Sequence, residues 1–93
     1  MKYIISESRL EDIFEKYIDS QYGLVWDKHL KQFNLPNGDL FGDIFEKHFY
    51  FEDTTDKSIL RSMFGDNVDK LMFDYIRKRF PNVKINGVED YGL

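Results

Sequence analysis

Apolar residues recur at helical spacing in three stretches of the chain, at 10–18, 59–64 and 68–76. Serine or threonine precedes the first two stretches and glycine follows them, as is typical of helix ends. The third stretch follows Asp66 and ends in three basic residues before Pro81, where positive charge suits the helix dipole. The pattern predicts three helices, which start at residue 6 or 8, at 54 or 55, and directly after Asp66.

Alternating or continuous apolar runs predict strands at both ends of the chain. Residues 2–5 form a short apolar run before the first helix, and residues 83–88 alternate near the C-terminus. We expect these segments to be the first and last strands, and residues 88–93 to form a flexible tail.

The middle of the chain favours a hairpin. Residues 35–39, Leu-Pro-Asn-Gly-Asp, suit a three-residue loop with glycine in the left-handed conformation. Strands at 24–33 and 41–51 would pair about this loop, with Gly42 as a bulge. The same two segments are also compatible with short helices. The hairpin register joins three apolar and three opposite-charge pairs: Phe33 with Phe41, Leu30 with Ile44, Val25 with Phe49, Lys31 with Asp43, Lys28 with Glu46, and Asp27 with Lys47.

The expected element order is β-α-β-β-α(α)-β, in a single domain of 93 residues. This order is the split β-α-β, or ferredoxin-like, pattern of α+β proteins, with an antiparallel sheet and helices on one face. A looser α+β arrangement of the same elements is the alternative.

The composition is that of a small acidic protein without thiol chemistry. The chain has a net charge of −4 and no cysteine. An acidic balance opposes general affinity for nucleic acid or for an anionic membrane, which depends on lysine and arginine. No apolar run is long enough to cross a bilayer, and the lack of cysteine suits a reducing compartment, so we expect a cytoplasmic protein. No motif indicates a cofactor, and we expect none.

Aromatic residues are abundant, with nine phenylalanines, six tyrosines and one tryptophan. If 41–51 is one strand, four of them share one of its faces: Phe41, Phe45, Phe49 and Phe51. A two-layer domain covers only one face of its sheet, so apolar groups on the other face predict a second contact. We therefore predict a homo-oligomeric or protein-binding surface formed by five residues: Trp26, Leu30, Ile44, His48 and Tyr50. The alternative is that these side chains belong to an ordinary core.

The element order and the aromatics also resemble an RNA-recognition motif. Tyr3, in Lys2-Tyr3-Ile4-Ile5, lies where that family has a first-strand aromatic, and Lys47-His48-Phe49-Tyr50-Phe51 lies on the strand of its basic and aromatic signature. The resemblance implies rings that stack on the bases of a single strand. The signature's glycines are missing, however, and acidic residues flank the segment. Binding of single-stranded nucleic acid or of a nucleotide-like small ligand is therefore the second hypothesis, and nucleic acid is the less favoured partner.

Candidate chemistry is sparse. His48 with Glu46 and Asp43 could form an acid–base pair or a metal site, but the spacing fits no ligand motif. The chain has neither a glycine-rich phosphate loop nor a nucleophile elbow. We therefore expect neither an enzyme nor a metal site. A separate basic patch could come from Lys70, Arg77, Lys78, Arg79 and Lys84, although charge at a helix C-terminus explains most of it equally well.

The two ends of the chain resemble small accessory proteins of tailed phages. The resemblance rests on Lys2-Tyr3-Ile4-Ile5-Ser6-Glu7-Ser8-Arg9-Leu10, on the phenylalanine-rich middle and on Asn82-Val83-Lys84-Ile85-Asn86-Gly87-Val88. It implies a non-enzymatic protein that acts by binding in the host cytoplasm. Some such proteins inhibit host defence, either by capping a host protein or by sequestering a nucleotide signal, so a host protein is a further expected partner.

Overall fold

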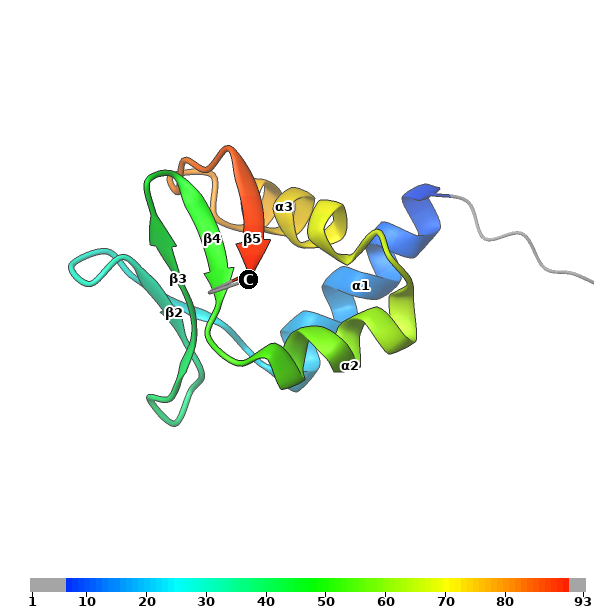
Figure 1. Ribbon diagram of the computed structural model, residues 1–93, viewed down its shortest axis with the longest axis horizontal. Coiled ribbons are helices and arrows are strands. Elements are labelled where there is room, and N and C mark those ends of the chain that lie inside the picture. The colour runs from blue at the N-terminus through cyan, green and yellow to red at the C-terminus, as the bar shows by residue number, and fades with distance from the viewer. Residues whose placement is uncertain (1–6, 91–93) are drawn as a thin grey trace, which may run out of the picture.

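The computed structural model describes the backbone of residues 7–90, which form three helices and a five-stranded sheet (Figure 1). Figure 1 shows the helices gathered on one side of the sheet, and the protein is therefore an α+β protein, as the sequence predicts. The helices are α1 (Glu7–Gln21), α2 (Thr54–Phe64) and α3 (Val68–Arg79). The strands are β1 (Val25–Asp27), β2 (Gln32–Asn34), β3 (Leu40–Phe45), β4 (His48–Phe51) and β5 (Gly87–Asp90).

The strands lie in the sheet in the order β1-β2-β3-β4-β5. The first four form antiparallel pairs, whereas β5 runs parallel to β4. The connection between these two contains α2 and α3, because parallel neighbours need a crossover rather than a tight turn. The sheet is mixed, so the prediction of an antiparallel sheet is wrong. The ferredoxin-like arrangement is not confirmed, since β4 and β5 are direct neighbours in the described part of the chain.

The three helices lie where apolar periodicity predicts them. α3 begins after Asn67, one residue later than a cap at Asp66 would place it. α1 and α3 are joined by Asp19, which accepts hydrogen bonds from the Tyr75 hydroxyl at 2.6 Å and from the Arg79 guanidinium. Burial raises the pKa of Tyr75 well above its ordinary value, and the bond to Asp19 adds to this. Within residues 7–90, no helix has the length and apolar character needed to span a bilayer.

Phe33 lies at the centre of the packing between the sheet and the helices. Its side chain is fully buried. Its ring lies 4.8 Å from that of Trp26, 5.8 Å from that of Phe49 and 4.9 Å from that of Phe80, measured between ring centroids. Tilted and edge-to-face contacts of this kind stabilise a core by about 0.5–1.5 kcal/mol each beyond the area that they bury. Much of the aromatic content is therefore used in the core.

The predicted long hairpin is divided into three shorter ones, β1–β2, β2–β3 and β3–β4. Residues 24–33 are divided into β1 and β2 by a turn at 28–31, and residues 41–51 reverse direction at Glu46 and Lys47. Both of these residues have positive φ, 49° and 65°, as a two-residue type I′ loop requires. Such loops usually contain asparagine and glycine, and the sequence pattern missed this one because Glu-Lys is not a turn signal.

The second turn changes which aromatic residues share a face. Phe45 pairs with His48 on the face opposite the core, where its side chain is 59% exposed. Phe49 is fully buried, and Ile44 pairs with it on the core face. The predicted faces, with Phe45 beside Phe49 and Ile44 beside His48, are therefore wrong. Side chains alternate between the two faces of the sheet within one strand, but a turn resets which residues lie on which face.

The predicted loop at 35–39 is present, and a bulge lies beside Gly42, where Phe41 is the residue without a strand partner in β2. The Leu35 N–H donates to the Asp39 carbonyl at 2.8 Å, and Asn34 pairs with Leu40 in the predicted register. The register then shifts by one residue, so that Phe33 pairs with Gly42. The bulge therefore moves every later pair away from its predicted partner.

The predicted pairs beyond the bulge do not form. Phe33 does not pair with Phe41, and neither Leu30 with Ile44 nor Val25 with Phe49 is a strand pair. None of the predicted charge pairs is an ion pair among the described residues: Lys31 with Asp43, Lys28 with Glu46, Asp27 with Lys47. The lysines of the first turn thus remain without carboxylate partners in the described chain.

The predicted strand at 2–5 lies outside the described residues. The last strand is at 87–90 rather than at the predicted 83–88. Residues 88–90 were expected to belong to a flexible tail, but they pair with β4. Residues 91–93 lie outside the described residues. Val83 and Ile85 alternate as in a strand and are buried, but they belong to the connection between α3 and β5.

Candidate functional site

A cavity of about 740 Å³ lies where two turns meet the connection between α3 and β5. The β1–β2 turn contributes Lys28 and Lys31, the β3–β4 turn contributes Glu46 and Lys47, and the connection contributes residues 82–84. We call this the turn cavity. Its remaining lining comes from the adjoining strand ends, with Trp26, Ile44 and Phe45.

The first turn is held by the side chain of Asp27. One carboxylate oxygen accepts the N–H of His29 at 2.9 Å and the N–H of Leu30 at 3.1 Å, an arrangement in which an aspartate closes a turn on its own backbone. Lys31 then adopts a left-handed conformation, with φ of 54°, and its carbonyl accepts the N–H of Ile44 at 2.8 Å. The turn is thereby fixed against β3, and its lysines are placed at the cavity.

The second turn is fixed to the connection before β5. The Lys47 carbonyl accepts the N–H of Asn86 at 2.6 Å. The left-handed conformation costs residues such as Glu46 and Lys47 about 1–2 kcal/mol each, because Cβ approaches the following carbonyl. Two charged residues are therefore held at the cavity by a backbone conformation that neither favours.

Two aromatic residues are among those that line the turn cavity with the lysines. Trp26 is half-buried, with its ring 4.8 Å from that of Phe33 in the core. Phe45 is 59% exposed, at the end of β3. The cavity thus combines flat apolar surface with flexible cationic side chains.

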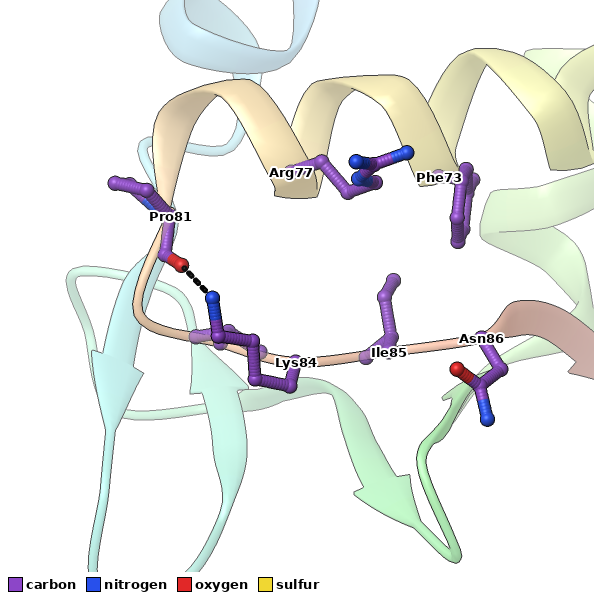
Figure 2. A pocket seen from close by; sticks show the side chains of 7 residues that line it. Phe73, Arg77, Pro81, Lys84, Ile85 and Asn86 are labelled. Atoms are coloured by element: carbon purple, nitrogen blue, oxygen red, sulfur yellow. Dashed lines mark hydrogen bonds between the residues drawn. The ribbon is translucent and has the colours of Figure 1, made fainter.

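A second cavity, of about 580 Å³, lies between α3 and the connection at 81–86 (Figure 2). We call this the helix cavity. In Figure 2, Ile85 points from the connection toward α3, which carries Phe73 and Arg77. The Arg77 guanidinium lies over the Phe73 ring, 5.4 Å from its centroid. Lys84 lines both cavities.

Some cations of the described residues pair with carboxylates, whereas the cations of the two cavities do not, and neither do Lys16 and Arg61, which lie outside both cavities. Those with carboxylate partners include Lys57 with Asp69 at 2.8 Å, Lys70 with Asp74 at 2.9 Å, Lys78 with Glu15 at 3.1 Å, and Arg79 with Asp19. The five that line the two cavities form no ion pair with any described residue: Lys28, Lys31, Lys47, Arg77 and Lys84.

Folding therefore sorts charges that are mixed along the sequence. Five cations and one carboxylate, Glu46, give the two linings a charge of +4, although the whole chain has a net charge of −4. A cleft lined by one sign of charge attracts ligands of the opposite sign over distances comparable with the screening length. The arrangement can hold an anion and can stack a ring against it.

The structure separates the five residues predicted to form one binding surface. Trp26 and Ile44 line the turn cavity. Leu30 is 65% exposed in the β1–β2 turn. His48 and Tyr50 lie on the sheet face opposite the core, because they alternate with buried residues of β4. The five residues therefore do not form a single surface.

Sequence reasoning missed most of the cavity's charged lining. Lys28, Lys31 and Lys47 were expected to be neutralised across a hairpin, and Lys84 was grouped with residues at the end of α3. Their shared location follows from two turns and a crossover, none of which has a local sequence signal. The sequence could have placed Phe45 at the cavity only if the turn at 46–47 had been known.

The candidate acid–base and metal residues do not form a site. His48 Nδ1 lies 3.0 Å from the backbone carbonyl of Glu46, an interaction within the turn. His29 is exposed. Among residues 7–90, no group of three histidine, aspartate or glutamate side chains is placed to hold a metal ion.

Comparison of the chain with family models, curated proteins and solved structures gives no match. Function is therefore inferred from the geometry of the described residues.

Proposed function

We propose that this protein is a non-enzymatic binding protein, and that its turn cavity takes a small ligand in which phosphate is joined to a planar ring, as in a nucleotide. One observation carries the proposal. Lysines from two turns and from the connection before β5 line this cavity without ion-pair partners in the described chain, together with the aromatic residues Trp26 and Phe45.

The electrostatic part of the argument rests on the lysine ammonium groups. A lysine that already pairs with a carboxylate must lose that partner before it can bind phosphate, whereas Lys28, Lys31 and Lys47 have no such partner in the described chain. A hydrogen bond between an ammonium and a phosphate oxygen is charge-assisted and contributes about 1.5–3 kcal/mol. Several such contacts favour a ligand with more than one negative charge.

The aromatic part of the argument rests on Trp26 and Phe45. A base that stacks on an aromatic side chain gains about 1–3 kcal/mol, whatever its sequence identity. Phe45 is 59% exposed, so a ligand ring can reach it without unfolding the core. The cavity volume of about 740 Å³ lies within the usual range of small-molecule sites.

The experiment is a fluorescence titration. Trp26 is the chain's one tryptophan and lines the turn cavity, so its emission should change when a ligand enters. We expect adenosine and guanosine triphosphates to quench it, and inorganic tripolyphosphate to bind more weakly because it has no ring. The double variant Lys28→Ala/Lys47→Ala should lose at least about tenfold in affinity.

The matched control is Lys16→Ala, which removes an exposed lysine of α1 that lies outside both cavities. This variant should bind like the parent protein. If no nucleotide changes the emission of Trp26 or the melting temperature at millimolar concentration, the proposal fails.

The resemblance to tailed-phage accessory proteins adds a biological setting to this proposal. Of the two modes of host-defence inhibition that it implies, sequestering a nucleotide signal in the host cytoplasm is the one that a cationic, aromatic cavity favours.

Self-association is a second candidate function, favoured by the sheet face opposite the core. This face carries Val25 and Phe45, which are 54% and 59% exposed, together with Tyr50. Native mass spectrometry should show a dimer or larger species that Val25→Glu weakens and that the helix variant Ile59→Glu leaves intact. A monomer at high protein concentration would remove this candidate.

A further inference from the structure

The turn cavity and the helix cavity adjoin, because Val83 and Lys84 line both of them. We propose that the two cavities bind one linear ligand, a pair of linked nucleotides, with one phosphate in each cavity and Lys84 between them. This inference rests on the proposed function of the turn cavity and extends it to the length of the ligand.

Arg77 gives the helix cavity its own phosphate-binding group. It is one of three consecutive basic residues at the end of α3, and the other two, Lys78 and Arg79, form ion pairs with α1. Arg77 instead lies over Phe73, with the guanidinium carbon 5.4 Å from the ring centroid. This stacking limits the motion of the guanidinium while leaving its N–H groups available for a bidentate contact with phosphate.

Lys84 is placed to contact both halves of such a ligand. Its Nζ donates a hydrogen bond to the Pro81 carbonyl at 3.3 Å, and Figure 2 shows the side chain folded back along the connection. An ammonium has three donors, so two remain for ligand oxygens. The contact with Pro81 holds the charge beside the shared segment of the two linings.

Each cavity therefore combines at least one cationic group with an aromatic residue. The turn cavity has lysines beside Trp26 and Phe45, and the helix cavity has Arg77 beside Phe73. A nucleotide repeats the same two features, a phosphate and a planar base. Two linked nucleotides thus match two adjoining cavities, whereas a mononucleotide would leave Arg77 unused.

The test is a length series measured by Trp26 fluorescence with thymidine monophosphate, the thymidine dinucleotide and the tetranucleotide. The parent protein should bind the dinucleotide at least about tenfold more tightly than the mononucleotide. The slope of log affinity against log salt should steepen by about 0.7 for each further phosphate that is contacted. An affinity that stops rising at two nucleotides supports the proposal, and an affinity that rises again at four overturns the limit of two and indicates a longer single strand.

The deciding variant is Arg77→Ala, which should remove the advantage of the dinucleotide and leave mononucleotide affinity unchanged. Arg77→Lys should retain part of the dinucleotide's advantage in affinity, because lysine keeps the charge but lacks the planar guanidinium that makes a bidentate contact. Arg61→Ala, at an exposed arginine of α2 outside both cavities, is the control. If mononucleotide binds and the dinucleotide gains nothing, this inference is overturned while the proposed function survives. If no nucleotide binds, both are overturned.

Discussion

The β3–β4 turn offers a perturbation that separates backbone strain from ligand electrostatics. Glu46 and Lys47 both have positive φ, 49° and 65°, and both line the turn cavity with opposite charges. Glycine at either position relieves the same kind of strain. Lys47→Gly, however, removes a cation from the cavity, and Glu46→Gly removes its one carboxylate. Each variant is the control for the other.

The expected gain in stability follows from the conformational cost. A left-handed backbone costs an ordinary residue about 1–2 kcal/mol. The greater freedom of glycine in the unfolded chain opposes about 0.5–1 kcal/mol of that gain. Each variant should therefore be more stable by about 0.5–1 kcal/mol, which raises Tm by roughly 2–8 °C in a domain of this size.

The two variants should affect ligand affinity in opposite directions. Loss of one charge-assisted contact in Lys47→Gly should weaken nucleotide binding by about tenfold. Glu46→Gly should strengthen it, because a carboxylate no longer repels phosphate. Thermal melts followed by circular dichroism and titrations of Trp26 fluorescence measure both quantities on the same samples. A loss of stability in both variants would refute the strain argument, and a change of affinity in the same direction in both would refute the electrostatic one.

Two further predictions concern the fold itself. Gly42→Ala should destabilise the protein by about 1–3 kcal/mol, because a Cβ at this buried position would lie 2.6 Å from Cε1 of Phe49. Chemical denaturation measures this loss, and an unchanged denaturation midpoint would contradict the packing. The contribution of Tyr22 and Tyr75 to stability should be fully present below pH 10 and should be lost progressively as pH rises above 10. Burial raises the pKa of Tyr22 to about 12 and also raises that of Tyr75, so the folded protein keeps protons that the unfolded chain releases at the ordinary value of 10.0. Melting temperatures across this range should fall less steeply in Tyr75→Phe, and equal slopes in both proteins would show that Tyr75 does not contribute.

The helices could be predicted from the sequence because their signals are local. Apolar residues at helical spacing, with serine, threonine and glycine at the ends, place all three to within about two residues. The loop at 35–39 was found for the same reason, since its proline and its glycine, Gly38 with φ of 95°, mark backbone conformations directly.

The sheet could not be predicted in full because its remaining features depend on tertiary contacts. Glu46 and Lys47 turn the chain without any turn residue, and the contact between the Lys47 carbonyl and Asn86 compensates for the unfavourable conformation. Val83 and Ile85 have the alternation of a strand, yet their side chains are buried in the connection after α3. An extended connection can bury every second side chain just as a strand does, so alternation alone does not identify a strand.

The cavities were inaccessible to sequence reasoning for a related reason. Their cations come from two turns, a helix and a crossover connection, which lie far apart along the chain. Only the fold shows that Lys78 and Arg79 are neutralised by α1 while the neighbouring Arg77 is not. The sequence pattern grouped Arg77 and Lys84 with Lys70, Lys78 and Arg79, whereas folding places these two at adjoining cavities with Lys28, Lys31 and Lys47.

The central claim is that the turn cavity binds a nucleotide, and its most direct test is the titration of Trp26 fluorescence in the parent protein, in Lys28→Ala/Lys47→Ala and in Lys16→Ala. The account predicts saturable quenching by nucleoside triphosphates, at least about tenfold weaker in the double variant and unchanged in the control. Equal affinity in all three proteins, or no quenching in any of them, would contradict it.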